Sequence, residues 1–397
     1  KILRENFTDL YKDTKKIINL KKNDLVIDIG SNDGNLLGNF KTKHKAKMHK
    51  ITTLRDKFRN PTLNLSLISK PWSKNLHHVF FVFRDTAKRD YPVIIPRAIS
   101  TWYRTRGLFM GGGYPNCTNL VEFIQVNTTG NAADFGDLTA PTNRLINACF
   151  GSRTRGFAAG GGAPSPNSPT NVIQQHEFAS TGNFNDFGDL SSARNEMSNL
   201  SNATRGVMGM GYPSTNNGIE YITMSSEGNS VDFGDMASAT TGRGTMSSPT
   251  RGVMSSGEGQ ASPYAITNTI EYLTISTLGN MADFGDAVRA VRYPAAIANA
   301  VRGVQAMGGS PNSYTNQIEF ITMATLGDAQ DFGDLVMSNN DYGGGCLGSP
   351  TRAVFCTGNY THADYVQIMS TGNAVDFGNL LASRRQLSGS SNGHGGL

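Results

Sequence analysis

Lysine is absent from residues 92–397 of this 397-residue chain. All 15 lysines lie in residues 1–91, which also carry 5 arginines and 9 acidic residues and therefore have a net charge of +11. Residues 92–397 carry 16 arginines against 22 acidic residues, a net charge of −6. The overall charge of +5 thus describes the N-terminal quarter only, and it does not predict a nucleic-acid-binding surface on the rest.

Cysteines and long apolar runs are also scarce. The four cysteines, Cys117, Cys149, Cys346 and Cys356, form no CxxC pair and are too scattered for a disulfide framework. Cys346 and Cys356 are one conceivable pair, but buried free thiols are the expectation. No apolar run approaches the ~20 residues of a membrane span, and the N-terminus has no apolar signal core. We therefore expect neither a membrane span nor a secretion signal.

One short element recurs along the chain. Asp134-Phe135-Gly136-Asp137 returns five more times, at steps of 52, 46, 51, 48 and 45 residues, and the last copy ends in Asn379. Around the copies the same order recurs, with Arg352-Ala353 as one variant: an Arg-Gly pair, a stretch of small residues, in most copies an apolar-acid-aromatic triplet, and in five copies a Gly-Asn pair. Six copies of one supersecondary unit indicate a repeat protein.

Each repeat predicts four short strands bounded by turn residues. The first contains small residues, the second follows the Arg-Gly pair, the third carries the acid-aromatic pair, and the fourth contains Asp-Phe-Gly-Asp. Units of this length with four strands are typical of propeller blades, and no helical period appears in them. The sequence therefore predicts an all-β fold, a six-bladed β-propeller over residues 92–397, preceded by a small α/β or irregular segment.

The N-terminal segment contains a different motif. Residues 1–22 have a helical pattern, residues 24–30 predict a short buried strand, and residues 31–37 predict a tight turn that opens a helix. A strand ending in an acid, a glycine turn and a helix N-terminus can hold a nucleotide-like cofactor. Residues 1–40 are thus assigned as an α/β fragment.

The wording Asp-Ile-Gly-Ser-Asn-Asp-Gly resembles motif I of class I S-adenosylmethionine-dependent methyltransferases. The resemblance covers about residues 15–40, and it implies that Asp28, Gly30, Asp33 and Gly34 would hold S-adenosylmethionine. No apolar strand leads into Asp56, the one acid between Asp33 and Asp85, so the ribose-binding acid of that family lacks a counterpart. A truncated or inherited fragment is the favoured reading, and a working methyltransferase is the alternative.

Residues 41–91 match no repeat. Lysine, histidine and arginine alternate there with scattered apolar residues, and Pro61 and Pro71 interrupt any long element. Residues 79–83 predict one buried strand. His77 and His78 beside it would point to opposite faces of a strand, so they make a poor metal-ligand pair. We assign this stretch as a basic linker or irregular segment.

The repeats resemble Kelch repeats in three features: a double glycine after the second strand, an aromatic residue in the third and a large apolar residue in the fourth. Phenylalanine stands where Kelch repeats usually have tryptophan. The Thr-Arg-Gly, Ile-Glu-Tyr-Ile-Thr and Gly-Asn-x-x-Asp-Phe-Gly-Asp-Leu wording, with a His-Gly-Gly-Leu end, is similar to repeat proteins of marine tailed phages, cyanophage types especially. That resemblance covers about residues 97–397 and implies a structural protein of the virion.

A residue present in every blade is expected to serve the blade itself. The aromatic rings of the repeated element should fill the space between neighbouring blades: Phe135, Phe187, Phe233, Phe284, Phe332 and Phe377. Gly136 and its equivalents should allow a bulge or a positive φ. Asp134 and Asp137 suit either calcium binding or, more simply, hydrogen bonding within their own turn. The Arg-Gly arginines are candidates for ion pairs with these acids.

No catalytic residue and no metal site is predicted, because the repeats hold only three histidines and no Ser/His/Asp set can be proposed. The predicted function is a structural or adhesive binding module of a phage particle. Its partners would be other virion proteins or a host surface glycan, its location the virion, and no cofactor is expected. The alternative is the N-terminal S-adenosylmethionine-dependent methyltransferase fused to a propeller.

Ring closure is the last expectation from the sequence. After the sixth repeat, residues 384–392 read like the small innermost strands elsewhere, yet no further unit follows them in this sequence. We predict that they pair with the first blade beside residues 106–111 and remove the open sheet edges. Residues 96–100 compete for the same place from the N-terminal side.

Overall fold

The structure is a computed structural model, and its chain divides into two compact units, residues 1–102 and 103–397. In the first unit it describes the backbone of four strands. In the second it describes residues 105–397 apart from 114–115, 165–167, 210, 214–216, 261–263, 311–312, 338–343, 357 and 359. No helix among the described residues is long and apolar enough to cross a membrane.

The first unit contains one four-stranded sheet, with strand order β2-β1-β4-β3. Its strands are β1 (Leu25–Ile29), β2 (Lys45–Met48), β3 (Leu65–Ser73) and β4 (Leu76–Phe83). β1 pairs in parallel with β2 and antiparallel with β4. The strands expected at residues 24–30 and 79–83 are present, and three of the four lie in the segment 41–91. The expected helix in residues 1–22 and the turn at 31–37 lie outside the described residues.

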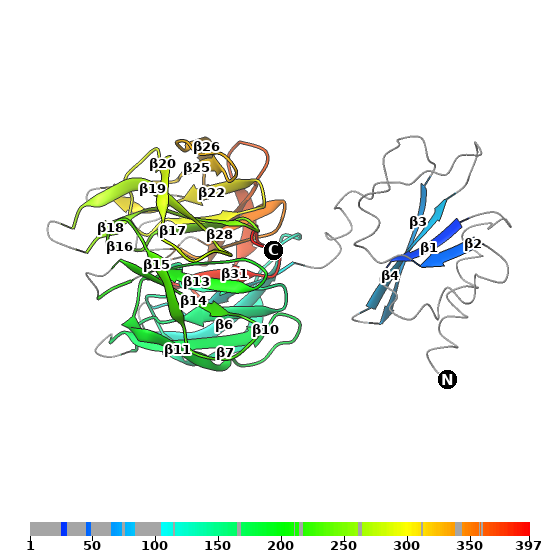
Figure 1. Ribbon diagram of the computed structural model, residues 1–397, viewed down its shortest axis with the longest axis horizontal. Coiled ribbons are helices and arrows are strands. Elements are labelled where there is room, and N and C mark those ends of the chain that lie inside the picture. The colour runs from blue at the N-terminus through cyan, green and yellow to red at the C-terminus, as the bar shows by residue number, and fades with distance from the viewer. Residues whose placement is uncertain are drawn as a thin grey trace. The chain divides into compact units, whose positions relative to one another are not determined.

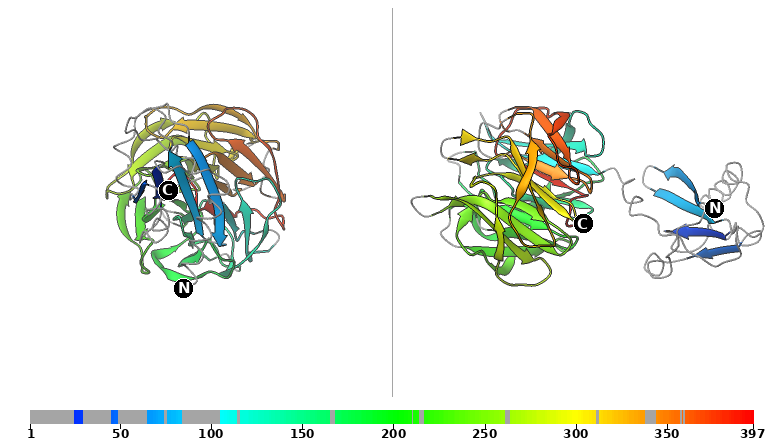
Figure 2. Two further views of the ribbon diagram at one scale, coloured as in Figure 1. Left: turned by 90° about the vertical axis from the view of Figure 1, so that its right-hand side faces the viewer. Right: turned by 90° about the horizontal axis from the view of Figure 1, so that it is seen from above.

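The second unit is the predicted six-bladed β-propeller. Six antiparallel sheets follow one another around a ring (Figures 1 and 2). We number the blades 1 to 6 in the chain order of their second strands. The innermost strands of blades 1 to 6 are β31 (Ser388–Ser391), β8 (Cys149–Gly151), β12 (Ser198–Ser201), β17 (Gly244–Ser247), β21 (Ala295–Ala298) and β27 (Cys346–Gly348).

The other three strands of each blade follow in the predicted order. The second strands are β5 (Arg106–Met110), β9 (Arg155–Ala159), β13 (Arg205–Gly209), β18 (Arg251–Gly259), β22 (Arg302–Ala306) and β28 (Arg352–Cys356). The third strands are β6 (Thr118–Gln125), β10 (Thr170–Glu177), β14 (Gly218–Thr223), β19 (Ile266–Thr274), β25 (Gln317–Thr322) and β29 (His362–Gln367). The fourth strands are β7 (Ala133–Thr142), β11 (Asn185–Arg194), β15 (Val231–Asp235), β20 (Ala282–Asp286), β26 (Gln330–Asp334) and β30 (Val375–Asn379). Three two-residue strands lie beside them: β16 (Thr240–Thr241), β23 (Gly309–Ser310) and β24 (Ser313–Tyr314).

Ring closure occurs as predicted. β31 pairs antiparallel with β5, with Ser388 opposite Met110 and Ser391 opposite Gly107, and so completes blade 1 from the far end of the chain. Because β31 also packs against β8 and β27, the innermost strands form an unbroken ring around the axis. Small residues are required there: a Cβ at Gly389 would lie 2.2 Å from the Cys346 carbonyl oxygen. The competing segment 96–100 lies outside the described residues.

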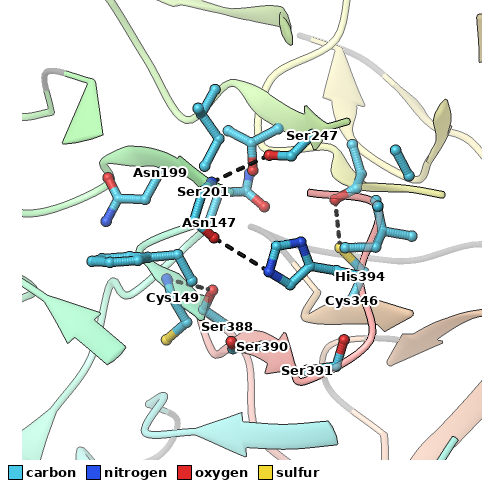
Figure 3. A pocket seen from close by; sticks show the side chains of 18 residues that line it. Asn147, Cys149, Asn199, Ser201, Ser247, Cys346, Ser388, Ser390, Ser391 and His394 are labelled. Carbon is cyan, nitrogen blue, oxygen red and sulfur yellow. Dashed lines mark hydrogen bonds between the residues drawn. The ribbon is translucent and has the colours of Figure 1, made fainter. Parts of the chain in front are cut away.

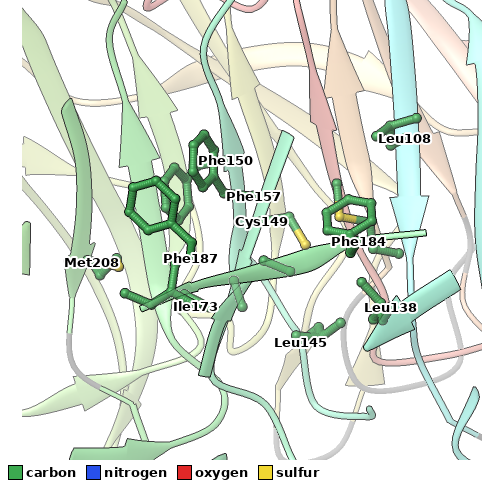
Figure 4. Close-up of a cluster of buried hydrophobic side chains, with 14 of the residues drawn as sticks. Leu108, Leu138, Leu145, Cys149, Phe150, Phe157, Ile173, Phe184, Phe187 and Met208 are labelled. Atoms are coloured by element: carbon green, nitrogen blue, oxygen red, sulfur yellow. The ribbon is translucent and has the colours of Figure 1, made fainter. Parts of the chain in front are cut away.

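The six repeat phenylalanines are buried between adjacent blades, with exposed fractions of 1–3%. Phe233, for example, packs with residues of blade 3 such as Val207 and residues of blade 4 such as Met254. Phe187 lies in the cluster that joins blades 1, 2 and 3 (Figure 4). In five blades the ring also meets an aromatic residue of the third strand edge to face, as between Phe233 and Tyr221 at 5.9 Å. These rings fill the space between neighbouring blades and stabilise the propeller.

The glycine after each phenylalanine permits close contact with the next blade. Gly136 has a φ of +145°, and the β6–β7 register shifts beside it, which confirms the expected bulge. A Cβ at Gly136 would lie 2.2 Å from the carbonyl oxygen of Gly182 in blade 2. The Asn183 side chain then accepts a 3.1 Å hydrogen bond from the Asp137 amide. The same contact recurs around the ring and ends with Asn131 of blade 1 accepting from Asn379.

The Arg-Gly arginines join the blades as well. Each guanidinium donates from Nη1 to a backbone carbonyl of the next blade, from Arg106 to Phe178 at 2.7 Å through to Arg352, which returns to Val126 of blade 1 at 3.4 Å. In five blades the guanidinium also lies over the aromatic ring of the third strand, as Arg251 lies 4.4 Å from the Tyr272 centroid. The expected pairing with the repeat acids is thus replaced by an inter-blade hydrogen bond.

Candidate functional site

The proposed cofactor residues are placed only in part. Asp28 lies in β1, one residue before the strand ends at Ile29. Gly30, Asp33 and Gly34 lie outside the described residues. The structure therefore provides the strand that the motif requires, and it leaves the turn after that strand as a prediction.

Neither the repeat acids nor the cysteines form a metal cluster among the described residues, where no group of three His, Cys, Asp or Glu side chains is placed to hold an ion. The four cysteines are free thiols, as expected, and Cys149, Cys346 and Cys356 are buried. Burial raises the pKa of each of these three thiols to about 12. They therefore stay protonated and unreactive at neutral pH.

The acid of the third strand forms a second ring of inter-blade contacts. In every blade the side-chain oxygen at this position accepts a hydrogen bond from a backbone amide that lies four residues after the repeat phenylalanine of the preceding blade. The donor–acceptor pairs are Leu381–Glu122, Thr139–Gln174, Ser191–Glu220, Ala237–Glu271, Val288–Glu319 and Val336–Asp364, at 2.7–3.2 Å. This contact requires a side-chain oxygen that accepts a hydrogen bond but does not require a charge. The amide oxygen of Gln174 therefore replaces a carboxylate in blade 2.

The charge of these acids is balanced differently from blade to blade. Arg384 pairs with Glu122 at 3.0 Å, and Arg243, only 1% exposed, pairs with Glu271. In blade 5 the Glu319 carboxylate instead receives a 2.7 Å hydrogen bond from the Gln305 amide. Burial raises the pKa of Glu319 to about 7, against the weaker opposing effects of these hydrogen bonds and of Arg289. Blade 5 thus carries an acid that a neutral side chain can replace.

We expect Glu319→Gln to stabilise the propeller above pH 7 by about 1–3 kcal/mol and to have little effect near pH 4. In the unfolded chain this carboxyl loses its proton near pH 4.5, whereas in the folded chain it keeps the proton up to about pH 7. The free energy of unfolding therefore falls as the pH rises between these values, and glutamine removes that loss. Urea unfolding at both pH values measures the effect.

Glu271→Gln is the matched control, because the same substitution there leaves the buried guanidinium of Arg243 without its counter-charge. It should destabilise the propeller at both pH values. Equal effects of the two substitutions would contradict the assignment of Glu319 as the unbalanced acid.

A narrow cavity of about 40 Å³ lies on the propeller axis, among the innermost strands. It has room for a few water molecules and no larger ligand. The C-terminal segment lies against one end of it (Figure 3): His394 Nε2 is 2.7 Å from the Gly151 carbonyl oxygen and 3.3 Å from Ser201 Oγ. Burial lowers the pKa of His394 to about 4, so the ring is neutral at physiological pH. Without an acid to orient the imidazole, this Ser–His contact is structural.

The opposite end of the axis is bordered by residues in the left-handed conformation. Gln386, Arg144, Glu196, Gly242 and Tyr293 stand at equivalent positions before the innermost strands of blades 1 to 5, with φ of 50–60°. Their backbones are hydrogen-bonded from blade to blade at 3.0 Å, as from the Glu196 amide to the Arg144 carbonyl. Residues other than glycine are strained in this left-handed backbone conformation, and such strain concentrates at functional sites.

These positions also differ between blades, and they support a network of buried charge. Glu196 pairs with Arg144 at 3.0 Å and accepts a 3.0 Å hydrogen bond from the Tyr293 hydroxyl. Tyr293 also reaches Glu258 at 3.3 Å, and Glu258 pairs with Arg292 at 2.8 Å. Burial raises the pKa of both Glu196 and Tyr293. The network ties blades 2 to 5 together at this end of the axis.

The connections between second and third strands lie on the same side of the propeller as this network, because they are bridged to the segments that carry it. Tyr212 exchanges two 2.8 Å backbone hydrogen bonds with Asn195, and Gly309 pairs in the same way with Arg292. Four of these connections expose a tyrosine: Tyr212, Tyr264, Tyr314 and Tyr360, at 39–58%. We call this side, with the described residues of the six connections, the loop face.

The loop face and the network of Glu196 and Tyr293 were not predicted, because they lie where the repeats differ and not in what all blades share. Their signal in the sequence is a tyrosine in five of the six segments between the second and third strands. This signal is found only by comparing the repeats with one another at the positions where they differ.

No protein-family model matches the chain, and no curated protein matches it. The described fold is that of a six-bladed β-propeller, an architecture that is compatible with a binding module and is commonly non-enzymatic.

Proposed function

We propose that this chain is a binding module of a phage particle, a Kelch-like propeller whose loop face contacts a partner protein or a host surface glycan. The observation that supports the proposal is the set of exposed tyrosines on that face, Tyr212, Tyr264, Tyr314 and Tyr360. Tyrosine offers a large, rigid contact surface with a polar end and loses little conformational entropy on binding. Soluble proteins rarely collect such side chains on one face without a partner.

The geometry of the rest of the propeller favours binding over chemistry. The axial cavity is too small for a substrate, and the nearest histidine, His394, is buried and neutral. The shared residues of the repeats are engaged in contacts between blades. The described tyrosines of the loop face, in contrast, are accessible, and the connections that carry them differ from blade to blade.

Two measurements test the proposal. Mass spectrometry of virions purified from a phage that encodes the chain should find it as a component. The labelled chain should bind host cells, and Tyr264→Ala with Tyr314→Ala should weaken that binding about tenfold or more without lowering the melting temperature. Absence from the virion together with unchanged cell binding by the variants would refute both halves of the proposal.

The second candidate function is S-adenosylmethionine binding by the N-terminal unit, and the presence of β1 up to Ile29 favours it. Calorimetric titration of the full chain with S-adenosylmethionine tests it. Saturable binding in the micromolar range that Asp28→Ala abolishes would establish a cofactor site. A flat titration would leave the propeller as the functional part.

A further inference from the structure

Blade 5 differs from the other blades in how the acid of its third strand is balanced. In blades 1, 3 and 4 this acid lies beside an arginine, in the pairs Arg384–Glu122 at 3.0 Å, Arg194–Glu220 at 3.8 Å and Arg243–Glu271. In blade 6 the His362 imidazole lies 2.7 Å from Asp364, and blade 2 has a neutral glutamine. Glu319 of blade 5 is 7% exposed and takes part in none of the ion pairs between described residues.

Val291 occupies the position from which two of these arginines reach their acids. Arg194 and Arg384 each lie two residues before the left-handed residue that precedes an innermost strand, and so does Val291. The Arg194 carbonyl accepts a 2.8 Å hydrogen bond from the Gly161 amide of the preceding connection. The Val291 carbonyl accepts the same bond, also at 2.8 Å, from Gly257. A short apolar side chain, 4% exposed, thus stands where the other blades have a guanidinium.

A pocket of about 10 Å³ lies beside the unbalanced acid. Its walls include Val291, Met307, Gln317 and Glu319, and all of its lining residues belong to the described part of the propeller. The volume corresponds to about one water molecule. An ammonium group has the same size.

The acceptors of this pocket have capacity left. Glu319 accepts one hydrogen bond at each oxygen, at 2.7 Å from the Gln305 side chain and at 2.7 Å from the Val288 amide. A carboxylate offers about four acceptor sites, and Glu122 of blade 1 accepts the equivalent backbone bond while it pairs with its arginine. Gln317 Oε1 is buried and has no hydrogen-bond partner, a state that costs free energy until a donor arrives.

The backbone of the third strand supplies a further acceptor. In blade 1 Arg384 donates to the Leu120 carbonyl at 2.9 Å. In blade 4 Arg243 donates to the Thr269 carbonyl, also at 2.9 Å. Gln317 is the equivalent residue of blade 5, because all three lie two positions before the acid and opposite the last residue of the Asp-Phe-Gly-Asp element. Its carbonyl therefore lies where a cation is bound in the other two blades.

We propose that this pocket binds a primary ammonium group, carried by a small amine or by a lysine side chain. The three N–H donors of such a group match the Glu319 carboxylate and the two oxygens of Gln317. Its charge replaces the guanidinium of the other blades, and Val291 and Met307 offer apolar contacts to the carbon next to the nitrogen. A calcium ion would need six to eight oxygen ligands, more than the pocket supplies. The site is separate from the exposed tyrosines of the loop face and does not depend on them.

Arg289 is the like charge that an ammonium group meets at this pocket. It is exposed and donates to the Thr315 hydroxyl at 3.0 Å instead of to the Glu319 carboxylate. Among the influences on the pKa of Glu319, the attraction of Arg289 is the weakest. Because like charges repel, removal of Arg289 should strengthen ammonium binding.

Thermal unfolding of the full chain, followed by circular dichroism, tests the proposal. The measurement is made at about pH 8, where Glu319 is ionised because its pKa is about 7. Methylammonium chloride at about 100 mM, bound with a Kd of about 10 mM, should raise the melting temperature by about 2 °C relative to potassium chloride at the same concentration. Tetramethylammonium, which is larger and has no N–H donor, should have no such effect.

The amide of Nα-acetyl-lysine distinguishes the two sources of the ammonium group. A rise in melting temperature equal to that with methylammonium would show that the pocket admits a lysine side chain of a partner protein. A rise with methylammonium alone would restrict the ligand to small free amines. Both results support the site and differ only in its occupant.

Four variants locate the effect. Val291→Arg should fill the pocket as in blades 1 and 3, raise the melting temperature without amine and remove the response to methylammonium. Glu319→Gln should also remove the response, whereas Arg289→Ala should lower the Kd about threefold. Glu271→Gln is the matched control: its acid already has an arginine, so the variant should be destabilised and still respond.

Three results would overturn the proposal. They are equal effects of methylammonium and potassium, a response that persists in Glu319→Gln, and no response of the parent chain. In the last case a lower melting temperature of Arg289→Ala at the same pH would identify Arg289 itself as the counter-charge of Glu319.

Discussion

Removal of residues 385–397 is expected to abolish cooperative folding of the propeller. The deletion takes away β31, whose Ser388, Ser390 and Ser391 are at most 4% exposed, and Leu387, which is fully buried beside it. β5 would lose its innermost neighbour, and the backbone groups that it now shares with β31 would become an open edge. Circular dichroism on heating and size-exclusion chromatography should show a broad transition and association.

A shorter deletion of residues 393–397 provides the control. It removes His394 and the contacts at the end of the axis but keeps β31 paired with β5. Its melting transition should stay cooperative at a lower temperature. If the longer deletion proves harmless, another segment, such as residues 96–100, must be able to fill the place of β31.

Phe233→Ala should lower the free energy of unfolding by about 3–5 kcal/mol, because the ring is 2% exposed and fills the space between blades 3 and 4. Phe284→Ala should have a similar effect, since it occupies the same place between blades 4 and 5. Urea unfolding of the full chain measures both. The edge-to-face contacts with Tyr221 and Tyr272 add to the loss.

Val231→Ala is the comparison for these variants. Val231 lies on the same strand as Phe233 but is 52% exposed, so its truncation should change stability by no more than about 0.5 kcal/mol. A loss below about 1 kcal/mol for both phenylalanine variants would show that the space between blades can collapse around the missing rings.

The sequence by itself determined the architecture. Six repeats of one four-strand unit require a closed array, because each unit exposes an apolar face that only its neighbour can cover. The small residues of β31 after the sixth repeat identified the strand that closes the ring, since only such residues fit beside the axis. Glycine at position 136 indicated a positive φ for the same kind of steric reason.

Only the tertiary structure decided what the recurring polar residues do. The arginines before each glycine, the acids of the third strands and the asparagines of the Gly-Asn pairs all bind the backbone of the adjacent blade. Their partners lie 28–259 residues away along the chain, so no local pattern could indicate them. The sequence suggested ion pairs between the Arg-Gly arginines and the repeat acids, whereas in the fold each of these arginines donates to a backbone carbonyl of the next blade.

The loop face was likewise a product of the fold. In the sequence the four described tyrosines of this face are separated by about fifty positions each, with different neighbours. They share one side of the molecule because a four-stranded antiparallel blade places every connection between its second and third strands at the same edge. The repeat length determined how many such connections exist, and ring closure brought them around one axis.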